Sequence, residues 1–91
     1  MRATMFNMSL WVDETEPEML KEKYSAILAD SGFHVESFSE KYFKPYGYTA
    51  LWLLSESHFA IHTFPEENTT YIELSSCVEK QYKSFMGKIA S

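Results

Sequence analysis

The chain has 91 residues, 45% of them hydrophobic and 16% aromatic, which predicts one small folded domain and argues against a disordered chain. The 8 Lys and Arg residues against 13 Asp and Glu give a net charge of −5, so nucleic acid is an unfavourable partner and a cationic small molecule suits the chain better. A domain of this size buries only about 60–65% of its unfolded surface, so oligomerisation would add stability.

The location of the protein is predicted from its cysteine content and its apolar runs. Cys77 is the single cysteine, so no internal disulfide can form. The longest apolar run, Ala50 to Leu54, is far too short to span a membrane, and the first residues lack a signal-peptide core. We therefore expect a soluble cytoplasmic protein that does not bind membranes.

The first predicted elements are a strand and a helix. Alternate positions of the first segment are apolar, which predicts a strand with one buried face: Phe6, Met8, Leu10 and Val12. Thr15 then predicts a helix N-cap, with Glu18 as its capping-box partner and Pro17 in the first turn. Gly32 predicts the end of the helix. The apolar stripe of the helix is Leu20, Tyr24, Ile27 and Leu28.

Three β-forming segments separated by turns follow. Residues 33–43 are weakly patterned, with Phe38 and Tyr42 on one side, and the KPYG sequence at 44–47 predicts a turn. Residues 48–55 are almost entirely apolar, which predicts a central strand buried on both faces. Residues 58–64 alternate, and the strand predicted there places Phe59, Ile61 and Thr63 opposite His58, Ala60, His62 and Phe64.

The last part of the chain predicts a turn, a strand and a helix. PEEN at 65–68 is a turn sequence, and residues 70–76 are β-forming. The final helix is predicted from apolar residues at helical spacing: Tyr82, Phe85, Met86 and Ile89. The order β-α-β-β-β-β-α predicts an α+β two-layer sandwich, with two helices on one face of a mostly antiparallel sheet.

Residue spacing alone suggests two kinds of chemistry, a metal site and a hydrolase site. His58 and His62 could share a zinc ion on a helix, but a strand would separate them by about 13 Å, which excludes a common metal. A hydrolase needs a nucleophile with a recognisable local signature, and neither a GxSxG elbow nor such a signature around Cys77 is present. Spacing alone therefore favours a small core residue for Cys77 and a hydrogen-bonded sheet residue for His62.

A longer motif changes this interpretation. Residues 56–66 read ESHFAIHTFPE, and Cys77 follows Ser57 by twenty positions. This pattern closely resembles prokaryotic S-adenosylmethionine decarboxylases, in which a Glu-Ser-His-x-x-Ile-His-Thr-aromatic-Pro-Glu motif spans the self-cleavage point of the proenzyme. The resemblance extends more loosely from Phe6 to Cys77. It implies one domain of this family over residues 1–91, cleaved between Glu56 and Ser57.

The resemblance implies a cofactor that the chain makes from itself. Ser57 Oγ would attack the carbonyl of Glu56, and elimination and hydrolysis would leave a pyruvoyl group at position 57. Its ketone would form a Schiff base with S-adenosylmethionine, whose decarboxylation supplies aminopropyl groups for spermidine. His62 matches the processing histidine of the family, and Cys77 matches the residue that protonates the substrate carbanion. Thr49 stands where a serine hydroxyl usually assists processing.

The same resemblance implies substrate contacts and a partner. Phe43 and Phe64 fall at positions whose aromatic rings sandwich the adenine, and Glu66 matches the glutamate that binds the ribose hydroxyls. From the residues alone, both phenylalanines could equally be core residues. Active sites of the family lie at a homodimer interface, so a homodimer is expected.

Departures from the family pattern leave two alternatives open. The chain has Ser76-Cys77-Val78 where Thr-Cys-Gly is usual, and Met5 to Asn7 where Gly-Arg-His is common. Because valine adopts positive φ poorly, the backbone beside Cys77 is expected to differ from that of the family. One alternative is a pyruvoyl-dependent decarboxylase of ornithine or arginine. The other is an uncleaved, non-catalytic homologue that binds a nucleoside or regulates a partner.

Overall fold

A computed structural model describes residues 2–90 as one sheet with helices on one of its faces. The chain order is β1 (Phe6–Val12), α1 (Pro17–Asp30), β2 (Val35–Tyr42), β3 (Tyr48–Leu54), β4 (Ser57–Phe64), the 3-10 turn η1 (Pro65–Glu67), β5 (Thr69–Ser76) and α2 (Glu79–Ile89).

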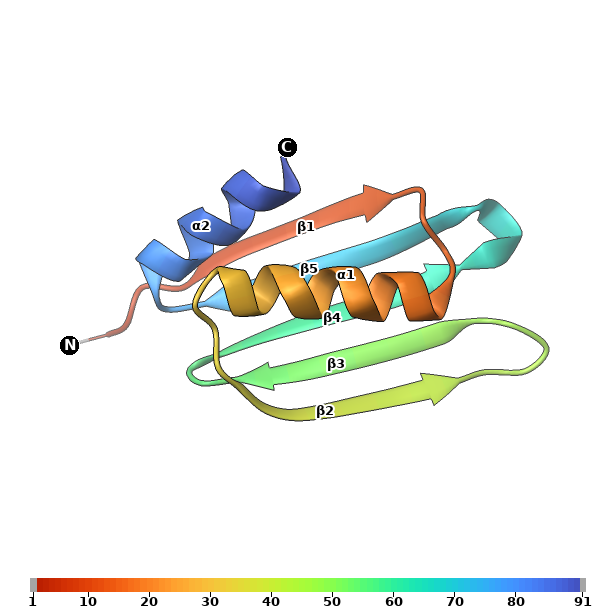
Figure 1. The fold of residues 1–91 in the computed structure, drawn as a ribbon, viewed down its shortest axis with the longest axis horizontal. Helices are drawn as coiled ribbons and strands as arrows, with labels where there is room; N and C mark the ends of the chain where they lie inside the picture. The colour runs from red at the N-terminus through yellow and green to blue at the C-terminus, as the bar shows by residue number, and fades with distance from the viewer. Residues whose placement is uncertain (1, 91) are drawn as a thin grey trace.

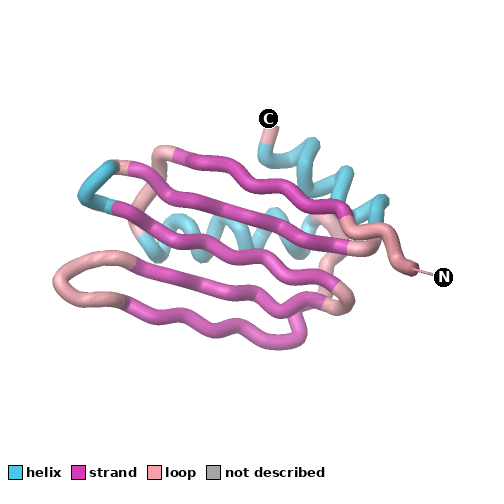
Figure 2. Tube along the Cα trace, turned by 180° about the vertical axis from the view of Figure 1, so that it is seen from behind, coloured by secondary structure: helices cyan, strands magenta, loops and turns pink. Residues whose placement is uncertain are grey.

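The sheet is antiparallel throughout and has the strand order β1-β5-β4-β3-β2. Figures 1 and 2 show α1 and α2 on the same face of the sheet, while the opposite face, which we call the outer face, carries no helix. The predicted α+β two-layer sandwich is therefore confirmed. Among residues 2–90, no helix has the length and apolar character that crossing a membrane requires.

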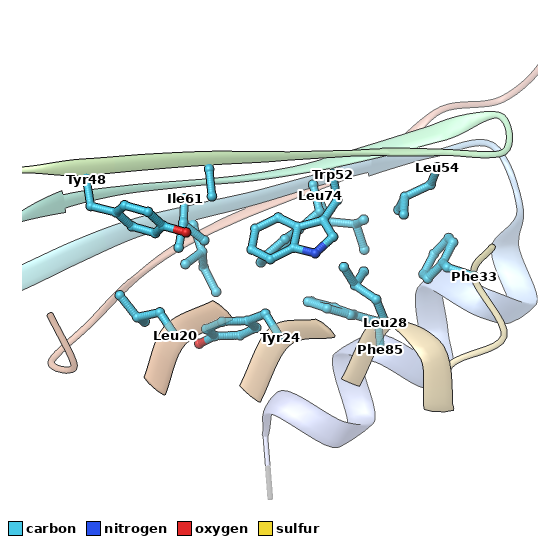
Figure 3. Close-up of a cluster of buried hydrophobic side chains, with 13 residues drawn as sticks. Leu20, Tyr24, Leu28, Phe33, Tyr48, Trp52, Leu54, Ile61, Leu74 and Phe85 are labelled. Atoms are coloured by element: carbon cyan, nitrogen blue, oxygen red, sulfur yellow. The ribbon is translucent and has the colours of Figure 1, made fainter. Parts of the chain in front are cut away.

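The core lies between the sheet and the helices (Figure 3). Phe59 is fully buried at its centre, where its ring lies 5.2 Å from that of Tyr24, 5.4 Å from that of Trp52 and 5.4 Å from that of Phe85, measured between centroids. Trp52 also donates a hydrogen bond from Nε1 to Ser25 Oγ of α1 at 3.1 Å. The predicted apolar stripes of both helices thus meet the sheet through aromatic contacts.

Burial of β3 differs from the sequence prediction, which placed residues 48–55 inside on both faces. Tyr48, Ala50, Trp52 and Leu54 point into the core, but Leu51 and Leu53 are 44% and 50% exposed on the outer face. The prediction was wrong because both helices cover the same face. A single chain consequently leaves an apolar surface without a covering layer.

The start of α1 also differs from the prediction. The helix begins at Pro17, and Glu16 is its N-cap, with a side-chain carboxylate that accepts the N–H of Glu18 at 3.1 Å. Thr15 instead donates its own N–H to the carboxylate of Glu14. Proline is favoured at the first helical position and keeps the preceding residue extended, so it moves the cap from Thr15 to Glu16. The predicted C-terminal end of α1 is confirmed, since Gly32 follows the helix at φ +94°.

A polar network joins α1 to β2 and β3. The hydroxyl of Tyr48 donates to Glu40 Oε1 at 2.6 Å, and Lys21 Nζ lies 3.3 Å from the same oxygen. The hydrogen bond from Tyr48, together with the ammonium of Lys21, holds the pKa of the Glu40 carboxyl below its usual value. Burial, together with the neighbouring Glu40 carboxylate, raises the pKa of the Tyr48 phenol. The network therefore favours a neutral Tyr48 beside a charged Glu40.

Candidate active site

The turn between β3 and β4 holds the predicted cleavage point. Leu54 pairs with Ser57 across the hairpin, so Ser55 and Glu56 alone form the turn. Glu56 has φ 59°, in the left-handed region that costs a residue other than glycine about 1–2 kcal/mol. The peptide bond between Glu56 and Ser57 therefore connects a residue with a strained backbone to the first residue of β4.

The groups around this peptide come from the end of β5. Ser57 is only 7% exposed, and its hydroxyl donates to Ser76 Oγ at 2.7 Å. The thiol of Cys77 donates to the carbonyl oxygen of Glu56, with Sγ 3.4 Å from that oxygen. We call Glu56, Ser57, Ser76 and Cys77 the turn half-site. It places a buried hydroxyl and a weak hydrogen-bond donor beside one peptide carbonyl.

Val78, the departure from the Thr-Cys-Gly pattern, has an ordinary backbone. Its φ is −106° and it serves as the N-cap residue of α2. Valine adopts this conformation freely. Val78 is therefore accommodated beside Cys77 without backbone strain.

The other predicted site residues gather at the opposite end of the sheet, around an open pocket of about 270 Å³. We call them the pocket half-site: Phe43, Thr49, His62, Phe64 and Glu66. Thr49 and His62 are partners in the β3–β4 register, and Thr49 Oγ1 lies 3.1 Å from His62 Nδ1. The loop that carries Phe43 is held by a hydrogen bond from Phe43 N–H to the carbonyl of Gly47 at 2.8 Å.

The charge of the pocket is acidic. Glu66, in η1, is exposed at its wall, and no Lys or Arg is found among the described residues that line it. With four Phe and Tyr residues lining it beside a carboxylate, the pocket suits a flat ligand that carries positive charge.

Two aromatic residues beside His62 were missed by the sequence analysis. Tyr71 of β5 stacks on His62 with ring centroids 6.2 Å apart and planes inclined by 26°. Trp11 of β1 packs on Tyr71 at 5.3 Å and on Phe64 at 5.7 Å. Strand alternation could have assigned each residue to a face, but only the register between strands places them beside His62.

The two half-sites are far apart in one chain. His62 lies five positions beyond Ser57 on β4, so strand rise separates them by about 16 Å, and their side chains point to opposite faces of the sheet. Figure 1 shows the β3–β4 turn at one end of the sheet and η1 at the other. One chain therefore does not bring His62 to Ser57.

His58 lies in β4 with His62, as the strand prediction required, and it is exposed on the outer face between Leu53 and Ser75. Within residues 2–90, no group of three or more His, Cys, Asp or Glu side chains is placed to hold a metal ion.

Fold and site together define a small α+β domain, with a buried serine and a cysteine beside the turn at one end of its sheet and an acidic aromatic pocket at the other. The family model described as S-adenosylmethionine decarboxylase matches residues 13–90. The chain therefore belongs to the S-adenosylmethionine decarboxylase family.

Similar proteins in bacteria carry related names. S-adenosylmethionine decarboxylase proenzyme 2 of Bacillus cereus is 55% identical over 47 residues, which cover 52% of this chain and 38% of that protein. The S-adenosylmethionine decarboxylase proenzyme of Brevibacillus brevis is 39% identical over 64 residues, which cover 70% of this chain and 48% of that protein. The chain thus matches less than half of the length of these relatives.

A solved structure supports the fold. The crystal structure of the adenosylmethionine decarboxylase from Aquifex aeolicus superposes with a TM-score of 0.68 at 22% identity, over 88% of this chain and 70% of that one. At this identity the likeness concerns the fold alone.

Proposed function

We propose that the chain is the precursor of a pyruvoyl-dependent S-adenosylmethionine decarboxylase that cleaves itself between Glu56 and Ser57. The observation that carries the proposal is the hydrogen bond from the Cys77 thiol to the Glu56 carbonyl oxygen, next to the Ser57 hydroxyl. This places a nucleophile and a carbonyl-polarising donor around one peptide bond.

The cleavage begins with attack of Ser57 Oγ on the carbonyl carbon of Glu56. Breaking the C–N bond converts the peptide to an ester and releases the amine of Ser57. The Cys77 thiol lies where negative charge develops on the Glu56 oxygen. Loss of the Ser57 α-proton then expels the Glu56 carboxylate, and water hydrolyses the remaining enamine, with release of ammonia. The products are residues 1–56 and a shortened chain that begins at position 57.

The turn half-site fits a pyruvoyl group at position 57. Ser57 supplies the carbon atoms of the group, and Cys77 is the neighbouring residue that can deliver a proton to a substrate there. The pyruvoyl group supplies an electron-withdrawing carbonyl that accepts the electron pair freed by the loss of carbon dioxide. The burial of Ser57 would limit the access of water to this carbonyl.

The pocket half-site supports S-adenosylmethionine as the substrate. Phe43 and Phe64 offer aromatic surfaces for an adenine, and the Glu66 carboxylate can accept hydrogen bonds from ribose hydroxyls. The acidic pocket also suits the positive sulfonium centre.

The chain's single cysteine fits a reducing compartment, and we propose a cytoplasmic location.

A homodimer would complete the active site. The turn half-site of one chain and the pocket half-site of a second would meet if two copies packed in opposite directions about a twofold axis. Such packing would cover the apolar side chains of the outer face, including Leu51, Leu53 and Trp11, which is 57% exposed. In this arrangement His62 and Thr49 of one chain act on Glu56 and Ser57 of the other.

Release of carbon dioxide tests the substrate. We expect the purified protein to release it from S-adenosylmethionine and not from ornithine or arginine, with the Ser57→Ala variant as the inactive control. Release from an amino acid without release from S-adenosylmethionine would favour the alternative decarboxylase. No release from any of the three would leave only a binding or regulatory role.

A further inference from the structure

Ser76, at the end of β5, is the direct hydrogen-bond partner of the proposed nucleophile. It is completely buried, and it pairs with Ser57 of β4 on one side and with Phe6 of β1 on the other. Its Oγ lies 2.7 Å from Ser57 Oγ and also accepts the backbone N–H of Val78 at 3.0 Å. The position of this oxygen is therefore fixed by two strands and by the first turn of α2.

We propose that Ser76 orients the Ser57 hydroxyl for attack on the Glu56 carbonyl and is thus a further residue of the self-cleavage site. The inference rests on the proposed function, because it assigns a role in the cleavage step. In its absence the Ser57 hydroxyl would rotate among several staggered positions, of which only some direct a lone pair at the carbonyl.

The direction of the hydrogen bonds supports this role. The N–H of Val78 can only donate, so it occupies one lone pair of Ser76 Oγ. The Ser57 hydroxyl donates to the same oxygen, so the Ser57 proton points toward Ser76 and the lone pairs of Ser57 Oγ remain free. Because both side chains are buried, water competes poorly for this bond.

The carbonyl that Ser57 would attack is held independently. Cys77, the next residue after Ser76, fixes the Glu56 oxygen through its thiol. The last residue of β5 and the residue after it therefore hold the two reacting groups, with Ser76 on the nucleophile and Cys77 on the carbonyl. The contact between Ser76 Oγ and Ser57 Oγ is the observation that points to a role in cleavage.

Two substitutions with the same branched side-chain shape separate the effect of the Ser76 hydroxyl from the effect of side-chain size. Ser76→Thr keeps the hydroxyl, whereas Ser76→Val has the same branched shape without it. We expect the Thr variant to cleave at close to the wild-type rate and the Val variant about tenfold more slowly, the ratio expected when one hydrogen bond is lost from the reacting arrangement. The rate is measured as disappearance of the intact chain after synthesis in a cell-free system. Ser84→Ala, in α2 and outside both half-sites and the outer face, is the control and should not slow cleavage.

Folding is checked separately in the uncleavable Ser57→Ala background, where thermal melting of the Ser76→Thr and Ser76→Val chains can be compared. If Ser76→Val is unfolded at the assay temperature, the smaller Ser76→Ala substitution replaces it, with the same expected slowing. Wild-type rates in folded Val or Ala variants, or equal slowing in Thr and Val, would overturn the inference and leave the proposed function intact. An uncleaved wild-type chain would instead overturn the proposed function itself.

Discussion

Because the two half-sites are far apart in one chain, we predict that two variants, each inactive alone, can cleave in trans when they are mixed. A residue that moves a proton must lie within about 3 Å of its target or one water away, but strand rise places His62 about 16 Å from Ser57 of its own chain. A His62→Ala chain keeps a usable Ser57, and a Ser57→Ala chain keeps a usable His62. Neither variant should cleave alone.

Co-expressing the two variants in equal amounts should restore cleavage of one of them. Random pairing puts about half of the His62→Ala chains into mixed twofold dimers, where each meets a partner with an intact pocket half-site. We therefore expect about half of the His62→Ala chains to be cut, and none of the Ser57→Ala chains. Tags of different mass on the two chains allow denaturing gels or mass spectrometry to count the fragments.

A matched control replaces the Ser57→Ala chain with a Ser57→Ala, His62→Ala double variant, which should restore nothing. If the wild-type protein cleaves but the mixture does not, the site is not shared between chains. Equal cleavage with the double variant would show that the His62 of the partner is not used. Efficient cleavage of His62→Ala alone would remove this residue from the mechanism.

Three further predictions concern stability. Phe59→Ala removes the ring at the centre of the core and should lower the free energy of unfolding by about 3–5 kcal/mol in urea titration; a loss below about 1 kcal/mol would contradict the described packing. In the Ser57→Ala background, Glu56→Gly should raise that free energy by about 1 kcal/mol by relieving the left-handed backbone, and a decrease would show that φ is not positive. The raised pKa of Tyr48 favours the neutral phenol in the folded state, so stability is retained below the usual tyrosine pKa of about 10 and falls as pH rises above it. Tyr48→Phe should flatten this alkaline fall in melting temperature, and an unchanged fall would refute the assignment.

Periodicity in the sequence predicted most of the fold. Alternation of apolar residues predicts β1 and β4, a continuous apolar run predicts β3, and helical spacing predicts α1 and α2, whereas β2 and β5 were predicted only from β-forming residues. Both Gly32 and the 44–47 turn lie where the chain changes direction. Leu10, predicted on the buried face of the first strand, is 43% exposed. Two further differences from the prediction have identifiable causes. Pro17 moved the helix cap by one residue, and the two-sided apolar pattern of β3 did not reveal that one face of a single chain would stay uncovered.

The candidate site was only partly accessible to sequence reasoning. The odd spacing of Ser57 and His62 on one strand already implies opposite faces, since strand side chains alternate. By contrast, the positions of Ser76 and Tyr71 depend on how β5 pairs with β4, and this register is set by the η1 connection. No local motif includes Tyr71, and the Ser76-Cys77-Val78 triplet does not by itself show what Ser76 contacts. The contacts of these two residues with Ser57 and His62 therefore required the three-dimensional structure.

The mass of the intact purified protein tests the central claim most directly. Self-cleavage at the Glu56–Ser57 bond predicts two fragments, one matching residues 1–56 and one lighter than residues 57–91 by a single ammonia. The Ser57→Ala variant should give one chain of full mass. A wild-type protein that stays a single chain with an intact Ser57 after prolonged incubation would contradict the account.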